Sequence, residues 1–115
     1  MQALTLLNDQ AYVEMALGFA VSILEKTQGK SDKDRVTHAV RRALSRDPSA
    51  REIEVLLSLL NEQSERLKSD TSIAKSLLSQ APQIEVSKKL DSDEVGAWFF
   101  VANALLNLDE TITKG

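Results

Sequence analysis

Two segments of this chain are apolar around most of a helix circumference, and they restrict the folds that the chain can adopt. The first lies within residues 9–28 and the second within 91–108. A helix with apolar side chains on nearly all sides belongs at the centre of a domain, because other helices must cover it. Leu, Ala, Ser, Glu and Lys dominate the composition and strand formers are scarce, which also favours helix over sheet. The two segments are therefore predicted to be the central helices of an all-α fold.

Capping and breaking residues divide the rest of the chain. Gly29 suits the end of the first helix. Ser49 and Glu52 have the spacing of a capping box. Pro48 ends the helix before that box, because the residue before a proline avoids helical backbone angles. Helices are expected from Asn8 or Asp9 to about 28, over about 31–46, 49–68 and 71–79, and from Asp91 or Ser92 onward.

The remaining segments are expected to be short. Residues 1–7 are predicted to form one extra turn, 81–90 a loop that contains Pro82, and 111–115 a fraying tail. The expected fold is a single domain over residues 1–115, an irregular bundle of four main helices plus one or two short ones. Short connections predict that neighbouring helices pack mostly antiparallel.

Composition excludes several classes of function. The net charge of −3 argues against nucleic-acid binding, which needs clustered cations. The 115 residues include no cysteine, which removes disulfides, thiolate metal sites and cysteine nucleophiles. The apolar stretch 15–24 is too short to cross a bilayer, so no membrane insertion is expected.

Catalytic, metal-binding and cofactor-binding groups are not recognisable in the sequence. His38 is the single histidine, and Arg35 and Arg42 lie one helical turn on either side of it. Two cationic neighbours would lower the pKa of His38 and make it a poor metal ligand, so a structural or solvated histidine is the simpler interpretation. Carboxylates at Asp91, Asp93 and Glu94 suit the start of a helix, and glycine-rich phosphate loops and calcium loops are absent. The domain is therefore predicted not to be an enzyme and to need no cofactor or metal.

A basic helix face is the first candidate interaction surface. Arg35, Arg42 and Arg46 follow one another at i, i+7 and i+11, with His38 between them. The simplest interpretation is charge pairing within the chain, between Arg41 or Arg46 and Glu54 or Glu62 of the next helix. The alternative is that this face docks an acidic surface of a partner.

The second candidate surface surrounds Trp98. Trp98, Phe99 and Phe100 are consecutive, so on a helix they span about 200° and cannot all face one side. Packing in the core against the first long helix is one interpretation. The other is that part of this aromatic face is covered by another domain.

Three stretches of the chain also resemble a known family. They are "MQALTLLNDQAYVEMA" at the start, "RRALSRDPSAREIEVLLSLL" in the middle and "VANALLNLDETITK" at the end. In this order they resemble the C-terminal part of a planctomycete domain of unknown function, found in proteins that often also carry planctomycete cytochrome C-like domains. The resemblance implies that the chain is the C-terminal fragment of a larger, exported multidomain protein. The haem-attachment motif Cys-x-x-Cys-His is absent here, so no haem role is implied.

The sequence thus predicts a non-catalytic helical packing or protein-interaction module at the C-terminus of a larger exported protein. Its expected partners are upstream domains of the parent chain or another protein. The alternative is a helical subdomain that completes an active site in the upstream chain and supplies a charged residue such as Arg42. A closing subdomain should show polar side chains converging on a cleft, whereas a packing module should show a flat apolar patch. An independent cytoplasmic regulator would require a complete chain, and the resemblance argues against it.

Overall fold

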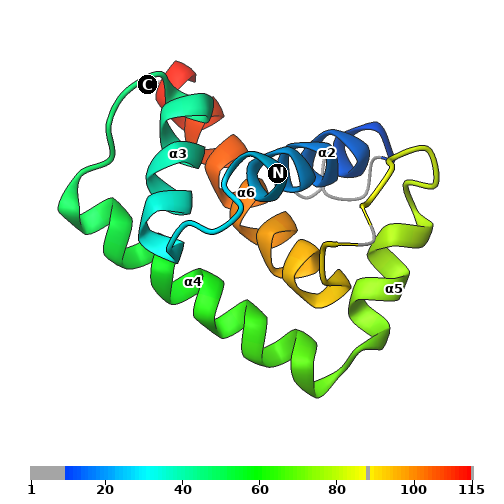
Figure 1. Ribbon diagram of the computed structural model, residues 1–115. Helices are drawn as coiled ribbons and strands as arrows, with labels where there is room; N and C mark the ends of the chain where they lie inside the picture. The colour runs from blue at the N-terminus through cyan, green and yellow to red at the C-terminus, as the bar shows by residue number, and fades with distance from the viewer. Residues whose placement is uncertain (1–9, 88, 115) are drawn as a thin grey trace.

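Five helices account for most of the residues that the computed structural model describes, which are 10–87 and 89–114, with side chains as far as Asn107. They are α2 (Gln10–Lys26), α3 (Asp32–Leu44), α4 (Ala50–Ser69), α5 (Ser72–Ser79) and α6 (Ser92–Lys114), as Figure 1 shows. These residues include no strand, which confirms the all-α fold. The expected turn over 1–7 and the expected cap at Asn8 or Asp9 lie outside the described residues. Within those residues, no helix has the length and apolar character needed to cross a membrane.

The helix ends follow local chemistry. At the start of α3, the Ser31 hydroxyl accepts a hydrogen bond from the Asp34 backbone N–H (3.2 Å). At the start of α4, Ser49 and Glu52 form the expected reciprocal capping box. Gly29 follows the end of α2 with a φ of 80°, a conformation that glycine adopts without strain. The sequence-based boundaries of α2, α4 and α5 are therefore within about two residues of the observed ones.

Two helix ends differ from expectation. α3 ends at Leu44, two residues early, because Ser45 takes a left-handed conformation (φ 58°) and its N–H bonds to the Arg41 carbonyl. α6 runs to Lys114, so the prediction of a fraying tail from residue 111 was wrong. No glycine or proline lies between 108 and 114 to interrupt that helix.

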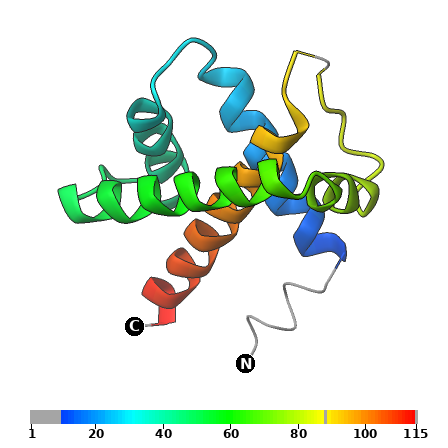
Figure 2. The same ribbon diagram turned by 90° about the horizontal axis from the view of Figure 1, so that it is seen from below.

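Helix α6 is the centre of the fold, as its apolar sequence predicted. It packs most extensively against α2 and α4 and also contacts α3 and α5. Figure 1 shows α6 passing between α2 and α4, and Figure 2 shows α4 crossing in front of it. Gly96 permits this close approach, because a Cβ atom there would lie 2.8 Å from Leu67 Cδ2 of α4. The largest fully buried side chains are Trp98, Leu17, Ile23, Leu24, Leu67 and Leu105.

The expectation of mostly antiparallel neighbours was wrong. In Figure 1, α3 and α5 both stand at wide angles to α4, which lies between them in sequence. Figure 2 shows that α4 also crosses α6. One central helix explains this geometry. Each outer helix buries its apolar side chains against α6 as well as against a neighbouring helix. Helices that cover several sides of one central helix cannot all run antiparallel to their neighbours. The irregular bundle is thus arranged around α6.

Candidate interaction surface

Arg35 lies on α3 but faces the interior of the domain. Its Nη1 atom is 2.9 Å from the Glu94 Oε2 atom at the start of α6, and its Nε–H donates to the Thr27 carbonyl after α2 (3.3 Å). The Arg35 side chain is only 13% exposed. Arg35 therefore connects α2, α3 and α6 and is not available to a partner.

Arg46 lies beyond the end of α3, so it does not extend the basic face of that helix. Its guanidinium forms a two-pronged ion pair with Glu52, with N–O distances of 2.8 and 2.7 Å. The hydrogen bonds from Arg46 and then from the Ser49 backbone N–H lower the pKa of Glu52 from 4.5 to about 2. Arg41 pairs with Asp47. Charge pairing within the chain is therefore real, but its partners are Asp47 and Glu52 rather than Glu54 or Glu62.

The acidic partners were misassigned because the connection between α3 and α4 folds back on itself. The prediction assumed two antiparallel helices, with arginines facing the middle of α4. Instead Ser45 reverses the chain, and the ion pairs form inside the connection and at the α4 cap. Each of these two ion pairs joins residues six positions apart in sequence.

Arg42 remains as the exposed cation of the predicted face. It donates a hydrogen bond to the Ser22 hydroxyl (3.0 Å), and its guanidinium carbon lies 5.8 Å from the Phe19 ring centroid. Both contacts come from α2, so they hold the Arg42 side chain of α3 against α2. None of the described acidic groups forms an ion pair with Arg42.

His38 lies one turn before Arg42 and is half-buried. Burial lowers the pKa of His38, and the positive charges of Arg42, Lys26 and Arg41 lower it further. Its buried Nε2 atom has no hydrogen-bond partner among the described residues. The sequence argument foresaw the effect of neighbouring cations, but it missed Lys26, which folding brings close from the end of α2. Lys26, His38 and Arg42 are referred to below as the basic seam.

Trp98 belongs to the core. Its side chain is 1% exposed, and Phe99 is also buried. Phe100 is the half-buried member of the three aromatics, and it contacts Phe99 edge-on, with a centroid distance of 5.1 Å. The Arg66 guanidinium covers the Phe100 ring at 5.2 Å. Trp98 is therefore a core residue, as the first interpretation expected. The surface near Trp98 is formed by Phe100 and Arg66.

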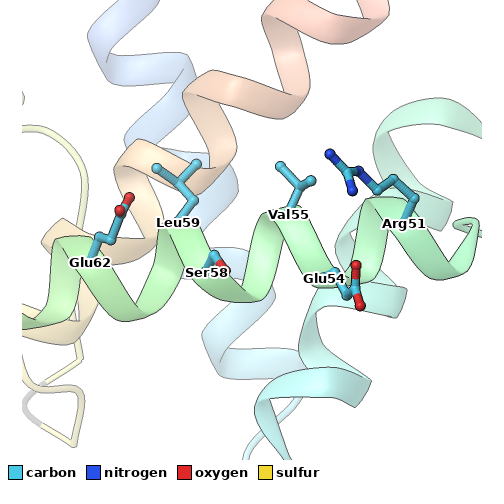
Figure 3. Close-up of a pocket in the computed structure, with 6 residues that line it drawn as sticks. All are labelled: Arg51, Glu54, Val55, Ser58, Leu59 and Glu62. Carbon is cyan, nitrogen blue, oxygen red and sulfur yellow. The ribbon is translucent and has the colours of Figure 1, made fainter.

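A surface on α4 was not singled out from the sequence. Val55, at 51% exposure, is one of the large exposed apolar side chains, and half-buried Leu59 lies one turn further along. Together with flanking polar residues they line a shallow, open depression, shown in Figure 3. The lining residues are Arg51, Glu54, Val55, Ser58, Leu59 and Glu62. Their three- and four-residue spacing is the signal that could have revealed this α4 outer face.

A more polar depression lies where α4 ends and α6 begins. It is lined by Ser64, Lys68, Asp91, Asp93 and Glu94. Asp93 and Glu94 occupy the first turn of α6, where carboxylates stabilise the positive end of the helix. Over the described part of the chain, histidine and acidic side chains do not gather into a group able to hold a metal ion.

The described residues define a cysteine-free all-α domain with an unneutralised basic seam on one side and a mixed apolar and charged face on another. The chain belongs to the PSD1 family, described as a protein of unknown function (DUF1553), whose family model matches residues 1–60. The resemblance to a domain of unknown function is thereby confirmed, while the planctomycete source and C-terminal position stay predictions. No curated protein and no solved structure shows significant similarity to the chain.

Proposed function

We propose that this domain is a non-catalytic protein-interaction module that docks an acidic segment on its basic seam. In keeping with the family resemblance, we place the domain at the C-terminus of a larger exported protein. The acidic segment then belongs to the upstream part of the same chain, or to another protein.

The state of Arg42 supports this proposal. Arg35, Arg41 and Arg46 each have an acidic partner, whereas Arg42 is exposed and held by Phe19 and Ser22. A guanidinium that is already positioned loses less conformational entropy on binding than a freely moving one. The planar guanidinium group also suits a carboxylate, because its N–H groups can donate two parallel charge-assisted hydrogen bonds to the two carboxylate oxygens.

The lowered pKa of His38 agrees with a positive potential at the seam, which adds to the larger effect of burial. After burial, the positive charges of Arg42, Lys26 and Arg41 each lower the pKa of the His38 imidazole. Such a potential attracts acidic partners and repels basic ones, which gives specificity and fast association more than affinity. A carboxylate placed in the seam would raise the pKa of His38.

The rise in the pKa of His38 tests the proposal, because His38 is the only histidine in the chain and its signal is unambiguous. NMR titration of the His38 ring should show a raised pKa when a Glu-rich peptide is added, and no change with a Gln-rich peptide of equal length. Arg42→Gln should weaken binding of the acidic peptide at least ~tenfold. Arg66→Gln is the matched control, because Arg66 also covers an aromatic ring but lies on α4. An unchanged His38 pKa, or an equal loss in both variants, would refute the proposal.

The parent chain allows a second test. The upstream segment, expressed separately, should bind the domain in sedimentation equilibrium, and Arg42→Gln should weaken that complex by a similar factor. A complex that tolerates this substitution would show that the upstream chain docks elsewhere and not on the basic seam.

The polar depression between α4 and α6 supports a second candidate function. Its convergent Ser64, Lys68 and carboxylates are what a subdomain closing over an upstream active site would present. In that case Lys68→Gln should lower the activity of the intact parent protein at least ~tenfold without weakening association of the domain. Unchanged activity would rule this function out for that depression.

A further inference from the structure

The α4 outer face carries opposite charges at its two ends. Residues 51, 55, 58 and 62 are spaced by four, three and four, so they fall within about 60° of one helix face. Arg51 is at one end and Glu62 at the other, with Val55 and Ser58 between them (Figure 3). Arg51 and Glu62 are both exposed, and neither forms an ion pair with another described residue.

This pattern is complementary to itself. With a rise of 1.5 Å per residue, the ends of the stripe lie about 16 Å apart along α4, and the midpoint falls between Val55 and Ser58. A second α4, turned by 180° about that midpoint, brings its Glu62 against Arg51 and its Arg51 against Glu62. The exposed Val55 side chain then meets the partner's Ser58 and the edge of its Leu59. A parallel arrangement would place like charges against each other.

We propose that the α4 outer face is a two-fold interface that binds a second copy of this chain, with the two α4 helices antiparallel. Isologous contacts of this kind place one surface patch against itself and close after two copies. The two Arg51–Glu62 pairs fix the register, and burial of the half-exposed Val55 at the centre provides the apolar contact. The inference is independent of the proposed function, which uses the basic seam.

The expected association is weak and reversible. Exposed ion pairs contribute little, and the stripe has only one strongly exposed apolar side chain. Such a face is smaller than the ~800 Å² per partner that stable complexes bury, so the dissociation constant is expected on the order of 0.1–1 mM. Copies of the domain that are tethered close together would reach local concentrations in that range.

The test exchanges charges at the two ends of the stripe. Sedimentation equilibrium at about millimolar concentration and low salt should give an average mass well above the 12.7 kDa of one chain. Arg51→Glu should abolish this association by facing Glu62 with a second carboxylate, and Glu62→Arg should do so by facing Arg51 with a second guanidinium. An equimolar mixture of the two variants should associate again, because every facing pair is then opposite in charge.

Two control variants separate the effect of the stripe from the effect of net charge. Lys75→Glu on α5 and Glu85→Arg in the following loop make the same changes in net charge at exposed sites away from it, and should associate like the wild type. Circular dichroism checks that all variants fold. The inference is overturned if the wild type stays monomeric at millimolar concentration, if the stripe variants associate like the wild type, or if their mixture associates no better than either alone.

Discussion

Removing the guanidinium of Arg35 tests how the three elements around it are held together. Arg35→Met keeps most of the side-chain stem but loses both hydrogen bonds, one to the Thr27 carbonyl and one to the Glu94 carboxylate. Helix α3 is then no longer tied by that side chain to the end of α2 or to the start of α6. The companion variant Glu94→Gln keeps an oxygen acceptor and removes only the charge.

The size of the loss follows from exposure and distance. A hydrogen bond that involves a charged group contributes ~1.5–3 kcal/mol when its partner is buried. Glu94 is 38% exposed, so its contribution is reduced toward the ~1 kcal/mol of surface ion pairs. The bond to Thr27 is long, at 3.3 Å, and adds about another 1 kcal/mol at most. We expect Arg35→Met to destabilise the domain by about 2 kcal/mol, and to lower Tm by about 10 °C in a domain of this size.

Urea and thermal unfolding followed by circular dichroism measure this effect. The double-mutant cycle with Glu94→Gln should give a coupling free energy of about 0.5–1 kcal/mol, and added salt should reduce it. A loss below ~0.5 kcal/mol for Arg35→Met, within the range of ordinary surface substitutions, would show that Arg35 does not tie the helices together.

Three further predictions concern single residues. The folded pKa of Glu52 is about 2, below its ordinary 4.5, so its ion pair with Arg46 stabilises the domain above pH 4.5, and that stability is lost as the pH falls toward 2. Glu52→Gln should flatten the fall of Tm over that range, and an unchanged pH profile would contradict the lowered pKa. Gly96→Ala gains ~1 kcal/mol in helix propensity but places a Cβ atom 2.8 Å from Leu67. We therefore expect the free energy of unfolding in urea to fall by about 1 kcal/mol. A rise in that free energy would show that the Leu67 side chain moves freely. Trp98→Ala should lose ~3–5 kcal/mol in the same assay, whereas a loss below ~1 kcal/mol would mean that the ring is not in the core.

The helices themselves could be predicted because their signals are local. The capping box of Ser49 and Glu52, the stop at Gly29 and the apolar circumference of α6 all lie within a few residues of the feature that they determine. One local signal failed at Ser45, because left-handed helix ends are usually made by glycine or asparagine. That single conformation removed Arg46 from the predicted basic face.

The candidate surfaces depended on contacts that sequence periodicity does not contain. Arg35 and Glu94 are 59 residues apart, so nothing local indicated that this arginine is neutralised inside the domain. The choice of Trp98 rather than Phe100 for the core depends on how the other helices pack around α6, because three consecutive aromatics point to different sides of a helix. The basic seam likewise needed Lys26 from α2 to join His38 from α3.

The central position of α6 also has a consequence for synthesis. All four other helices of the described chain contact α6, yet α6 follows them in sequence. At ~5–20 residues per second, a ribosome makes α2 on the order of ten seconds before the start of α6 is available to it. During that interval Leu17, Ile23 and Leu24 of α2 lack the helix that buries them in the finished domain. A nascent chain of this kind should therefore need a chaperone, or a neighbouring domain, until its last helix has left the exit tunnel.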